Sequence, residues 1–329
     1  MKYFIALDGG GTKLDAILFD ETGHIKERII TGGSNAMDIG YELAQKRLTT
    51  AVKTLGDKVG GEVEAIYCGI AGTMPMGDYV TEAVNASGIK YKHIQVGDDG
   101  TMIISAVLGQ KDACCIICGT GSSCFVRRKG KRLEKMGGKG YLIDSNGSGY
   151  DLGRECLRHA FRSIDGRDGK TMLVELVGEK MGLKAEDCFP NSDWMRKIYD
   201  PQTGGRPYIA KFSTCVFEAA SKGDEIAKQI IEEQSEQLAS LTYAAEKFFD
   251  GDFDVVMSGG IIQNVPEYAK LVISKASPRA HLIVSDEIPV YGAAVEDMLT
   301  SGCEVTKEFH DNFVNDYNTI KGNKLDIQL

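Results

Sequence analysis

The chain has 329 residues, and at roughly 150 residues per domain this length predicts about two domains. Its net charge of −9 argues against nucleic acid as a partner, because nucleic-acid-binding proteins present a basic face. No stretch approaches the roughly 20 apolar residues of a membrane span, and the first apolar run is too short for a signal peptide, so we expect a cytoplasmic protein that does not bind membranes.

The first part of the chain alternates strand and helix patterns. Residues 3–30 hold three apolar runs, separated by the turns DGGGTK and ETGH, and predict three strands. The patterns that follow predict a helix over 41–60, a strand over 63–70, a helix over 77–88, a strand over 92–97 and a helix over 101–109. This order predicts an α/β fold with a mixed or parallel sheet.

Residues 113–133 repeat the first hairpin pattern. The run ACCIIC, the turn GTGSS and the run CFVRR again give strand, glycine-rich turn and strand, about 110 residues later. A chance coincidence of two hairpins is the alternative. We interpret the repeat as two similar α/β domains facing each other, over residues 1–112 and 113–302.

The rest of the chain is mainly helical in pattern. Helices are predicted over 151–164, 170–182, 207–222, 224–250, 266–276 and 290–301. Strands are predicted within 254–264 and 281–286. Residues 303–329 are polar and lack strong periodicity, so they form either a tail that packs back on the first domain or a partly disordered end.

Nine cysteines, an odd number in a long chain, favour reduced and buried thiols. Cys115 and Cys118 form a C-x-x-C pair, which is a metal or redox signal in other contexts. The residues between them are apolar, and no second pair or histidine follows at ligand spacing. We therefore favour packing over a metal site for this pair.

Three glycine-rich turns follow apolar runs, and they are candidates for binding a nucleotide. Glycines in DGGGTK and GTGSS allow backbone N–H groups to approach an anion closely, and Asp8 suits a hydrated Mg²⁺. In SGG, at residues 258–260, glycines allow a flat ring to lie against the backbone. The alternative for each is a structural turn. Neither a P-loop nor a dinucleotide-binding fingerprint is present.

The three turns, in this order, resemble the phosphate-1, phosphate-2 and adenosine motifs of the actin/hexokinase/Hsp70 superfamily. Within it, the chain resembles the BadF/BadG/BcrA/BcrD-type ATPases, and especially the N-acetylglucosamine kinases. The phrases that carry this resemblance are ALDGGGTK, GGSNA, CGIAGT, QVGDDG, CGTGSS, GGKGYLIDSNGSGYDLG, MSGGIIQN and IPVYGAA.

The resemblance implies two RNase H-like domains with an interdomain cleft and an ATP- and Mg²⁺-dependent kinase acting on a hydroxyl of an amino sugar. N-acetylglucosamine is the expected sugar, with N-acetylmuramic acid and glucosamine as alternatives. The implied ATP-binding residues are Gly9, Gly10, Gly11, Thr12, Lys13, Gly119, Thr120, Gly121, Ser122, Gly259 and Gly260. Asp8 would hold Mg²⁺ through water.

Asp98 is implied as the general base, because the family aspartate directly follows the strand end; Asp99 is the adjacent alternative. A structural interpretation of Asp98 is a helix N-cap before Thr101. Asn35 would bind the sugar, and its structural interpretation is a turn residue. The full set implied to bind the sugar is Asn35, Asp98, Thr120, Gly138, Lys139, Gly140, Asp144 and Ser145.

One segment departs from the kinase pattern. The sugar kinases usually read G-D-E-G-S where this chain has Asp144-Ser145-Asn146-Gly147-Ser148, and the tryptophan of GGWG is Lys139 here. The loss of two acids puts the particular sugar in doubt. Lys139 is either a solvated lysine or a cation near the pocket that suits a carboxylate-bearing sugar such as N-acetylmuramic acid.

Two other functions stay open at this point. One is an ATPase that activates a partner enzyme, and the other is a non-enzymatic sugar sensor. A homodimer is also expected from the resemblance. The sequence does not fix the sugar, the hydroxyl that is phosphorylated, or the choice between Asp98 and Asp99.

Overall fold

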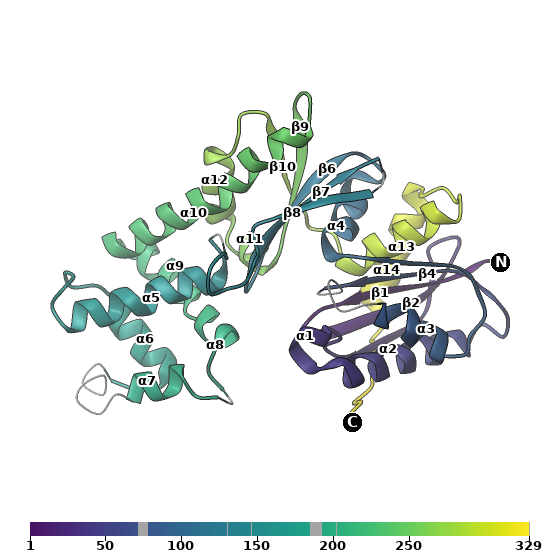
Figure 1. Cartoon of the computed structure of the whole chain (residues 1–329), viewed down its shortest axis with the longest axis horizontal. Coiled ribbons are helices and arrows are strands. Elements are labelled where there is room, and N and C mark those ends of the chain that lie inside the picture. The colour runs from purple at the N-terminus through teal and green to yellow at the C-terminus, as the bar shows by residue number, and fades with distance from the viewer. Residues whose placement is uncertain (72–77, 130, 146, 185–192, 202, 329) are drawn as a thin grey trace. The chain divides into compact units, whose positions relative to one another are not determined.

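The computed structural model describes residues 1–329 except 72–77, 130, 146, 185–192, 202 and 329, so Asn146 and Cys188 lie outside it. The chain divides into two compact units (Figure 1). One unit contains Met1–Lys111 and Glu287–Leu329, and the other contains Asp112–Asp286. The chain therefore leaves the first unit once and returns to it.

The first unit is built on a six-stranded sheet of order β11-β3-β2-β1-β4-β5. Its strands are β1 (Tyr3–Gly9), β2 (Lys13–Asp20), β3 (Ile25–Gly32), β4 (Val63–Ile70), β5 (Tyr91–Gly97) and β11 (Asn323–Lys324). The first three form an antiparallel meander, and β4 and β5 continue the sheet parallel to β1. The strands predicted in this region therefore form, as does the mixed sheet.

Helices cover both faces of this sheet (Figure 1). They are α1 (Ala36–Ile39), α2 (Tyr41–Gly56), α3 (Tyr79–Ala86), α4 (Asp99–Leu108), α13 (Pro289–Thr300) and α14 (Lys307–Thr319). Side chains of β1 alternate between the two layers: Ile5 and Leu7 pack with α2 and α3, while Phe4 and Ala6 pack with α13 and α14. Because β1 is buried on both faces, its sequence is a continuous apolar run.

The boundary between the units differs from the one expected at residue 302. Helix α13 belongs to the core of the first unit, where Val290 and Ala294 are buried against the sheet. The polar segment after it forms α14, whose Phe309 and Phe313 meet Phe19 edge-on at ring distances of 5.9 and 5.8 Å. The second face of the meander needs an apolar cover, and residues 287–329 supply it.

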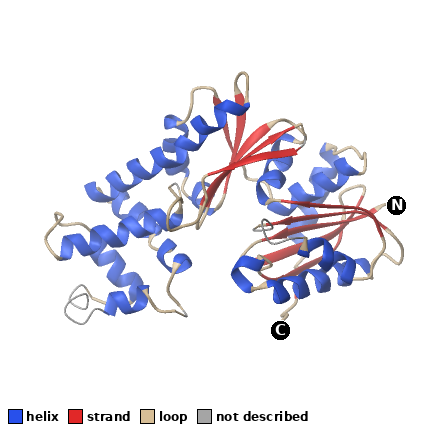
Figure 2. Cartoon of the chain, viewed as in Figure 1, coloured by secondary structure: helices blue, strands red, loops and turns tan. Residues whose placement is uncertain are grey.

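The second unit repeats the strand plan of the first. Its sheet has the order β10-β9-β6-β7-β8, formed by β6 (Ala113–Cys118), β7 (Ser122–Arg128), β8 (Lys131–Met136), β9 (Phe253–Ser258) and β10 (Ala280–Val284). Again an antiparallel meander is followed by strands parallel to its first member. The repeated hairpin in the sequence thus corresponds to a repeated sheet (Figure 2).

Helices dominate the remainder of the second unit (Figure 2). They are α5 (Gly149–Ile164), α6 (Leu173–Met181), α7 (Asp193–Ile198), α8 (Arg206–Ala210), α9 (Ser213–Ser221), α10 (Glu225–Ala245), the 3₁₀ turn η2 (Glu246–Phe248), α11 (Gly260–Asn264) and α12 (Pro266–Lys275). The single helix predicted over 207–222 is in fact two, α8 and α9. None of the described helices is both long and apolar enough to span a membrane.

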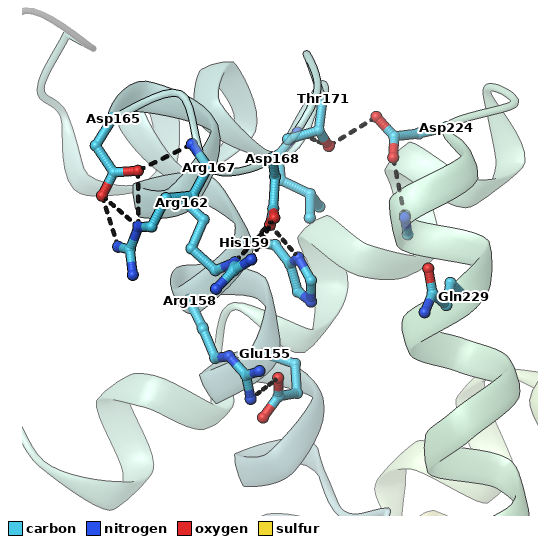
Figure 3. Close-up of polar contacts among 12 residues, drawn as sticks. Glu155, Arg158, His159, Arg162, Asp165, Arg167, Asp168, Thr171, Asp224 and Gln229 are labelled. Carbon is cyan, nitrogen blue, oxygen red and sulfur yellow. Dashed lines mark hydrogen bonds and ion pairs between the residues drawn. The ribbon is translucent and has the colours of Figure 1, made fainter.

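Polar contacts fix the turn between α5 and α6 (Figure 3). Asp168 accepts hydrogen bonds from Arg162 Nε at 2.9 Å and lies 2.7 Å from His159 Nδ1, both on α5. Asp224, the N-cap of α10, accepts from the Thr171 hydroxyl at 2.8 Å. The turn therefore connects α5 to α10. Because these polar side chains stabilise the turn, their clustering is explained without a bound ligand.

The cysteines of the described chain are free thiols. Cys115 and Cys118 are both fully buried in β6, and an offset of three residues places their side chains on opposite faces of the strand. Burial raises the pKa of the Cys118 thiol to about 12. Both features support packing as the role of this pair.

Candidate functional site

The loop between β1 and β2 presents unused amide groups. The Gly10 carbonyl accepts hydrogen bonds from the backbone N–H groups of Ser34 (2.8 Å) and Asn35 (3.2 Å). The N–H groups of Gly11 and Thr12 have no acceptor among the residues that the structure describes. The loop therefore directs carbonyl groups into the protein and leaves amide groups for an anion, as the phosphate-binding interpretation requires.

Glycines let the neighbouring loop 33–35 approach this one. A Cβ atom on Gly9 would lie 2.1 Å from Ser34 Oγ, and one on Gly33 would lie 2.1 Å from the Gly11 carbonyl oxygen. Ser34 is fully buried, and its hydroxyl has no hydrogen-bond partner within the described chain. Ser34 was not predicted from the sequence, where its only signal is its position beside Asn35.

Asn35 lies at the N-terminus of α1. Its Oδ1 accepts from the Met37 N–H at 2.9 Å, so its carbonyl oxygen caps the helix. Its Nδ2 donates to no acceptor among the described residues. The structural role foreseen for Asn35 is present, and its donor group remains available for a sugar hydroxyl or acetamido oxygen.

The register of the strands places two predicted site residues, Asp8 and Asp98, at the same end of the first sheet. Asp8 of β1 pairs with Gly69 of β4, and Gly69 pairs with Gly97 of β5, so these residues form one row across the sheet. Asp98 follows Gly97 and lies one residue beyond this row. With neighbouring strands about 4.8 Å apart, the Cα atoms of Asp8 and Asp98 are separated by roughly 10 Å.

Asp8 is half-buried, and its surroundings disfavour the ionised form of its carboxyl group. Burial raises its pKa from 3.8 to about 7, Lys13 opposes this rise, and the charges of Asp15 and Asp99 add to it. A bound cation would favour the ionised form. No group of three or more potential metal ligands exists in the described part of the chain.

Asp98 is the N-cap of α4 and is 9% exposed. Its Oδ1 accepts from the Thr101 N–H at 2.9 Å, which is the structural role considered for it. Asp99 begins the helix, and its Oδ1 lies 3.1 Å from the Gly100 N–H. A carboxylate has about four acceptor sites, so the cap at Asp98 is compatible with accepting a proton from a substrate.

The loop between β6 and β7 repeats the arrangement of the first hairpin. The carbonyl groups of Gly119, Thr120 and Gly121 accept backbone hydrogen bonds from Gly149 (2.8 Å), Tyr150 (3.0 Å) and Gly119 (2.9 Å). The N–H groups of Thr120 and Gly121 find no acceptor among the described residues. Two separate loops thus use their carbonyl groups internally and leave amide groups free.

Gly259 and Gly260 lie beside this second loop. Gly259 has a φ of +104°, and a Cβ atom there would lie 2.4 Å from the Cys118 carbonyl oxygen. Only glycine therefore fits at the end of β9. Gly260 opens α11, and its N lies 3.9 Å from the position of a Gly119 Cβ atom, so the predicted adenosine motif adjoins the predicted phosphate loop.

The segment implied to bind sugar also belongs to the second unit. Gly138 packs on β7, because its Cβ atom would lie 2.6 Å from the Ser122 carbonyl oxygen, and the Asp144 N–H donates to the Gly140 carbonyl at 2.8 Å. Lys139 is exposed, and its Nζ donates to the Lys135 carbonyl at 3.2 Å.

A cavity of about 410 Å³ adjoins this segment. Asp144 and Ser145 line it together with Asp151, Arg154 and Gln234. The second unit thus gathers loop 119–122, residues 138–145 and Gly259–Gly260, while the first gathers residues 8–13, Asn35 and Asp98.

Known proteins resemble this sequence along nearly the whole chain. The model of the BadF/BadG/BcrA/BcrD ATPase family matches residues 5–296. The N-acetyl-D-glucosamine kinase of Dictyostelium discoideum is 30% identical over 318 residues, which cover 89% of this chain and 97% of that protein. An N-acetylmuramic acid/N-acetylglucosamine kinase of Clostridium acetobutylicum is 27% identical over 307 residues, with coverage of 90% and 98%.

Solved structures show the same fold. The ROK family glucokinase of Streptomyces griseus covers 90% of this chain and 98% of its own, at a TM-score of 0.52 and 18% identity. This similarity and the doubled sheet confirm the predicted α/β, actin-like ATPase fold.

Proposed function

We propose a function from one premise: the chain belongs to the BadF/BadG/BcrA/BcrD ATPase family, as its motifs predicted. It is an ATP-dependent kinase that phosphorylates a hydroxyl group of an amino sugar. Relatives that align over about nine-tenths of this chain phosphorylate N-acetylglucosamine or both N-acetylglucosamine and N-acetylmuramic acid, as their names state. N-acetylglucosamine is the proposed substrate, with N-acetylmuramic acid and glucosamine as alternatives.

The pair of amide-presenting loops is the observation that carries this proposal. Gly11 and Thr12 in one hairpin and Thr120 and Gly121 in the other each offer unengaged N–H groups. Phosphoryl transfer asks a protein mainly for positioning and for neutralisation of charge, which such amides supply. We propose that both loops bind the phosphates of ATP and that Gly259 and Gly260 lie against its adenosine.

We propose Asp98 as the general base that accepts the proton of the sugar hydroxyl. Its place directly after β5, one residue beyond the row of Asp8, supports this role. Asn35, Thr120, Gly138, Lys139, Gly140, Asp144 and Ser145 complete the proposed sugar site. Mg²⁺, held by Asp8 through water, would shield the charge of the phosphates when bound. A homodimer remains a prediction from the resemblance, and a cytoplasmic location remains a prediction from the hydropathy of the sequence.

A coupled assay of ADP release tests the proposal with N-acetylglucosamine, glucosamine, N-acetylmuramic acid and glucose. We expect at least one amino sugar to stimulate turnover and Asp98→Asn to lower the stimulated rate by about 10²- to 10⁴-fold. Asparagine caps helices as well as aspartate does, so this variant keeps α4 intact.

Asp78→Asn is the matched control, because Asp78 caps α3 through the Thr81 N–H in the same way. Equal ATP hydrolysis with and without every amino sugar would contradict a kinase and agree with an ATPase that serves a partner. Unchanged turnover in Asp98→Asn would remove Asp98 as the base.

A further inference from the structure

Arg206 lies against the second phosphate loop. It opens α8, 85 positions after Gly121, and its Nη2 lies 2.0 Å from where a Cβ atom of Gly121 would stand. Its guanidinium carbon lies 5.9 Å from the centre of the Tyr141 ring, which is a cation–π distance. Arg206 can therefore come this close only because residue 121 is a glycine and has no Cβ atom.

The charge of Arg206 is not balanced by any carboxylate of the described chain. Other arginines of this unit form ion pairs, such as Arg154 with Asp151 and Arg162 with Asp168. Arg206 forms none, and its Nε is buried without a hydrogen-bond partner among the described residues. A half-buried guanidinium in this condition destabilises the protein unless an anion binds to it.

The distances allow one anion to meet both Arg206 and the loop. In any residue, the amide N and the Cβ position are roughly 2.5 Å apart, because both bonds to Cα are about 1.5 Å long. The Nη2 atom of Arg206 is therefore at most roughly 4.5 Å from the Gly121 amide N. A single oxygen that accepts hydrogen bonds of about 2.9 Å from each can bridge them.

We propose that Arg206 binds a phosphoryl group held by loop 119–122, together with the amides of Thr120 and Gly121. A planar guanidinium offers paired donors that match phosphate oxygens and places a full positive charge where amides place only dipoles. The inference rests on the proposed function for the source of this group, which we assign to the nucleotide beyond its α-phosphate. A phosphorylated sugar offers the same chemistry, so the experiment separates the two sources.

Calorimetric titration of Arg206→Gln with AMP, ADP, pyrophosphate and N-acetylglucosamine 6-phosphate tests the assignment. We expect affinity for ADP and pyrophosphate to fall about 10- to 100-fold while affinity for AMP is unchanged. Arg206→Lys keeps the charge without the fork and should recover part of the loss. Arg196→Gln removes an arginine of the same unit that pairs with Asp193, and it should bind ADP normally.

Thermal unfolding separates a binding role from a structural one. Because Arg206→Gln removes the contact with the Tyr141 ring but also an unpartnered buried Nε, the midpoint of the ligand-free variant should stay near that of the parent, whereas the stabilisation by ADP should shrink. Unchanged ADP affinity, an equal loss for AMP, or a lower midpoint that accounts for the loss would overturn the inference. A loss confined to the sugar phosphate would overturn the assignment to the nucleotide.

These measurements need no turnover, so they are independent of the sugar. If no amino sugar is phosphorylated but ADP binding still depends on Arg206, the proposed function fails and the inference stands. If an amino sugar is phosphorylated and Arg206→Gln binds ADP as the parent does, the inference alone fails.

Discussion

At the scale of single residues, Asp8 shows how a site can lower stability. Its folded pKa of about 7 lies above the ordinary 3.8, because burial and the charges of Asp15 and Asp99 disfavour ionisation. For a carboxyl group shifted in this direction, the folded state loses stability as pH rises from about 4 to 7, and the loss is constant above that range. The cost stays in place until a cation offsets it.

We therefore predict that Asp8→Asn stabilises the protein when metal and nucleotide are absent. The free energy of unfolding should rise by about 2 kcal/mol at pH 8, allowing for the partial exposure of Asp8, and by much less at pH 5. Urea unfolding in a chelator at both pH values measures this difference. The exposed Asp57 provides the control as Asp57→Asn. A gain that is equal at pH 5 and pH 8 would contradict the assigned pKa.

Adjacent glycines at the end of β9 allow a second residue-scale prediction. Gly259 has a φ of +104° and meets the Cys118 backbone, whereas the nearest atom to a Gly260 Cβ atom is Asn264 Nδ2 at 3.8 Å. Gly259→Ala should cost about 2–5 kcal/mol of stability through backbone strain and overpacking. Gly260→Ala should fold normally.

The same pair tests the adenosine site. If Gly260 lies against the nucleotide base, Gly260→Ala should weaken ATP binding while its unfolding midpoint stays near that of the parent. Thermal melts with and without ATP report both properties. Equal stability of the two variants would show that the close packing of Gly259 on β6 does not constrain this residue.

At the scale of elements, a buried ion pair fastens the C-terminal helix to the first hairpin. Asp15 of β2 is 1% exposed and accepts hydrogen bonds from Arg28 Nε (2.9 Å) and Nη2 (2.7 Å). Tyr317 of α14 donates to the same carboxylate at 2.9 Å. Burial alone would raise the pKa of Asp15, but the hydrogen bonds and charge of Arg28 outweigh it and hold the pKa low.

Arg28→Ala should therefore destabilise the protein by about 3–5 kcal/mol at pH 7, because it leaves a buried charge without its partner. In the parent, the depressed pKa stabilises the fold above the unfolded pKa of about 3.9, and this stability is lost as pH falls below it. In the variant, burial dominates, so acidification should reduce the deficit. The double variant Arg28→Ala/Asp15→Asn should recover most of the lost stability. If the losses of stability of the two single variants simply add in the double variant, the two residues are not coupled.

Elements with dense apolar patterns could be predicted from the sequence, and sparse ones could not. The strand predicted over 63–70 is β4, and the helix predicted over 151–164 is α5, which begins at Gly149. Helix α14 was missed because only Phe309 and Phe313 are buried among its 13 residues. Two apolar residues do not establish a helical period, so tertiary contacts with Phe19 decide the structure there.

At the scale of the whole molecule, the same contrast holds for the site. The hairpin loops could be found because each is a short glycine-rich segment between two strands. Arg206, Ser34 and the pairing of Asp15 with Tyr317 could not, because each depends on a contact between segments that are distant or unremarkable in sequence. Local motifs therefore identify the two hairpin loops, whereas the charged side chains around them are brought there by the fold.

The division into two units leads to a last prediction, about cooperativity. Trp194, the single tryptophan, is fully buried in the core of the second unit. Phe313 is fully buried in the first unit, and Phe313→Ala should cost about 3–5 kcal/mol there. If the units unfold separately, this variant should shift the part of the circular dichroism transition that reports the first unit. The tryptophan fluorescence transition, which reports the second unit, should stay in place. Val177→Ala, in the core around Trp194, should shift the fluorescence transition instead. Matching shifts of both signals in Phe313→Ala would mean that the two units unfold as one.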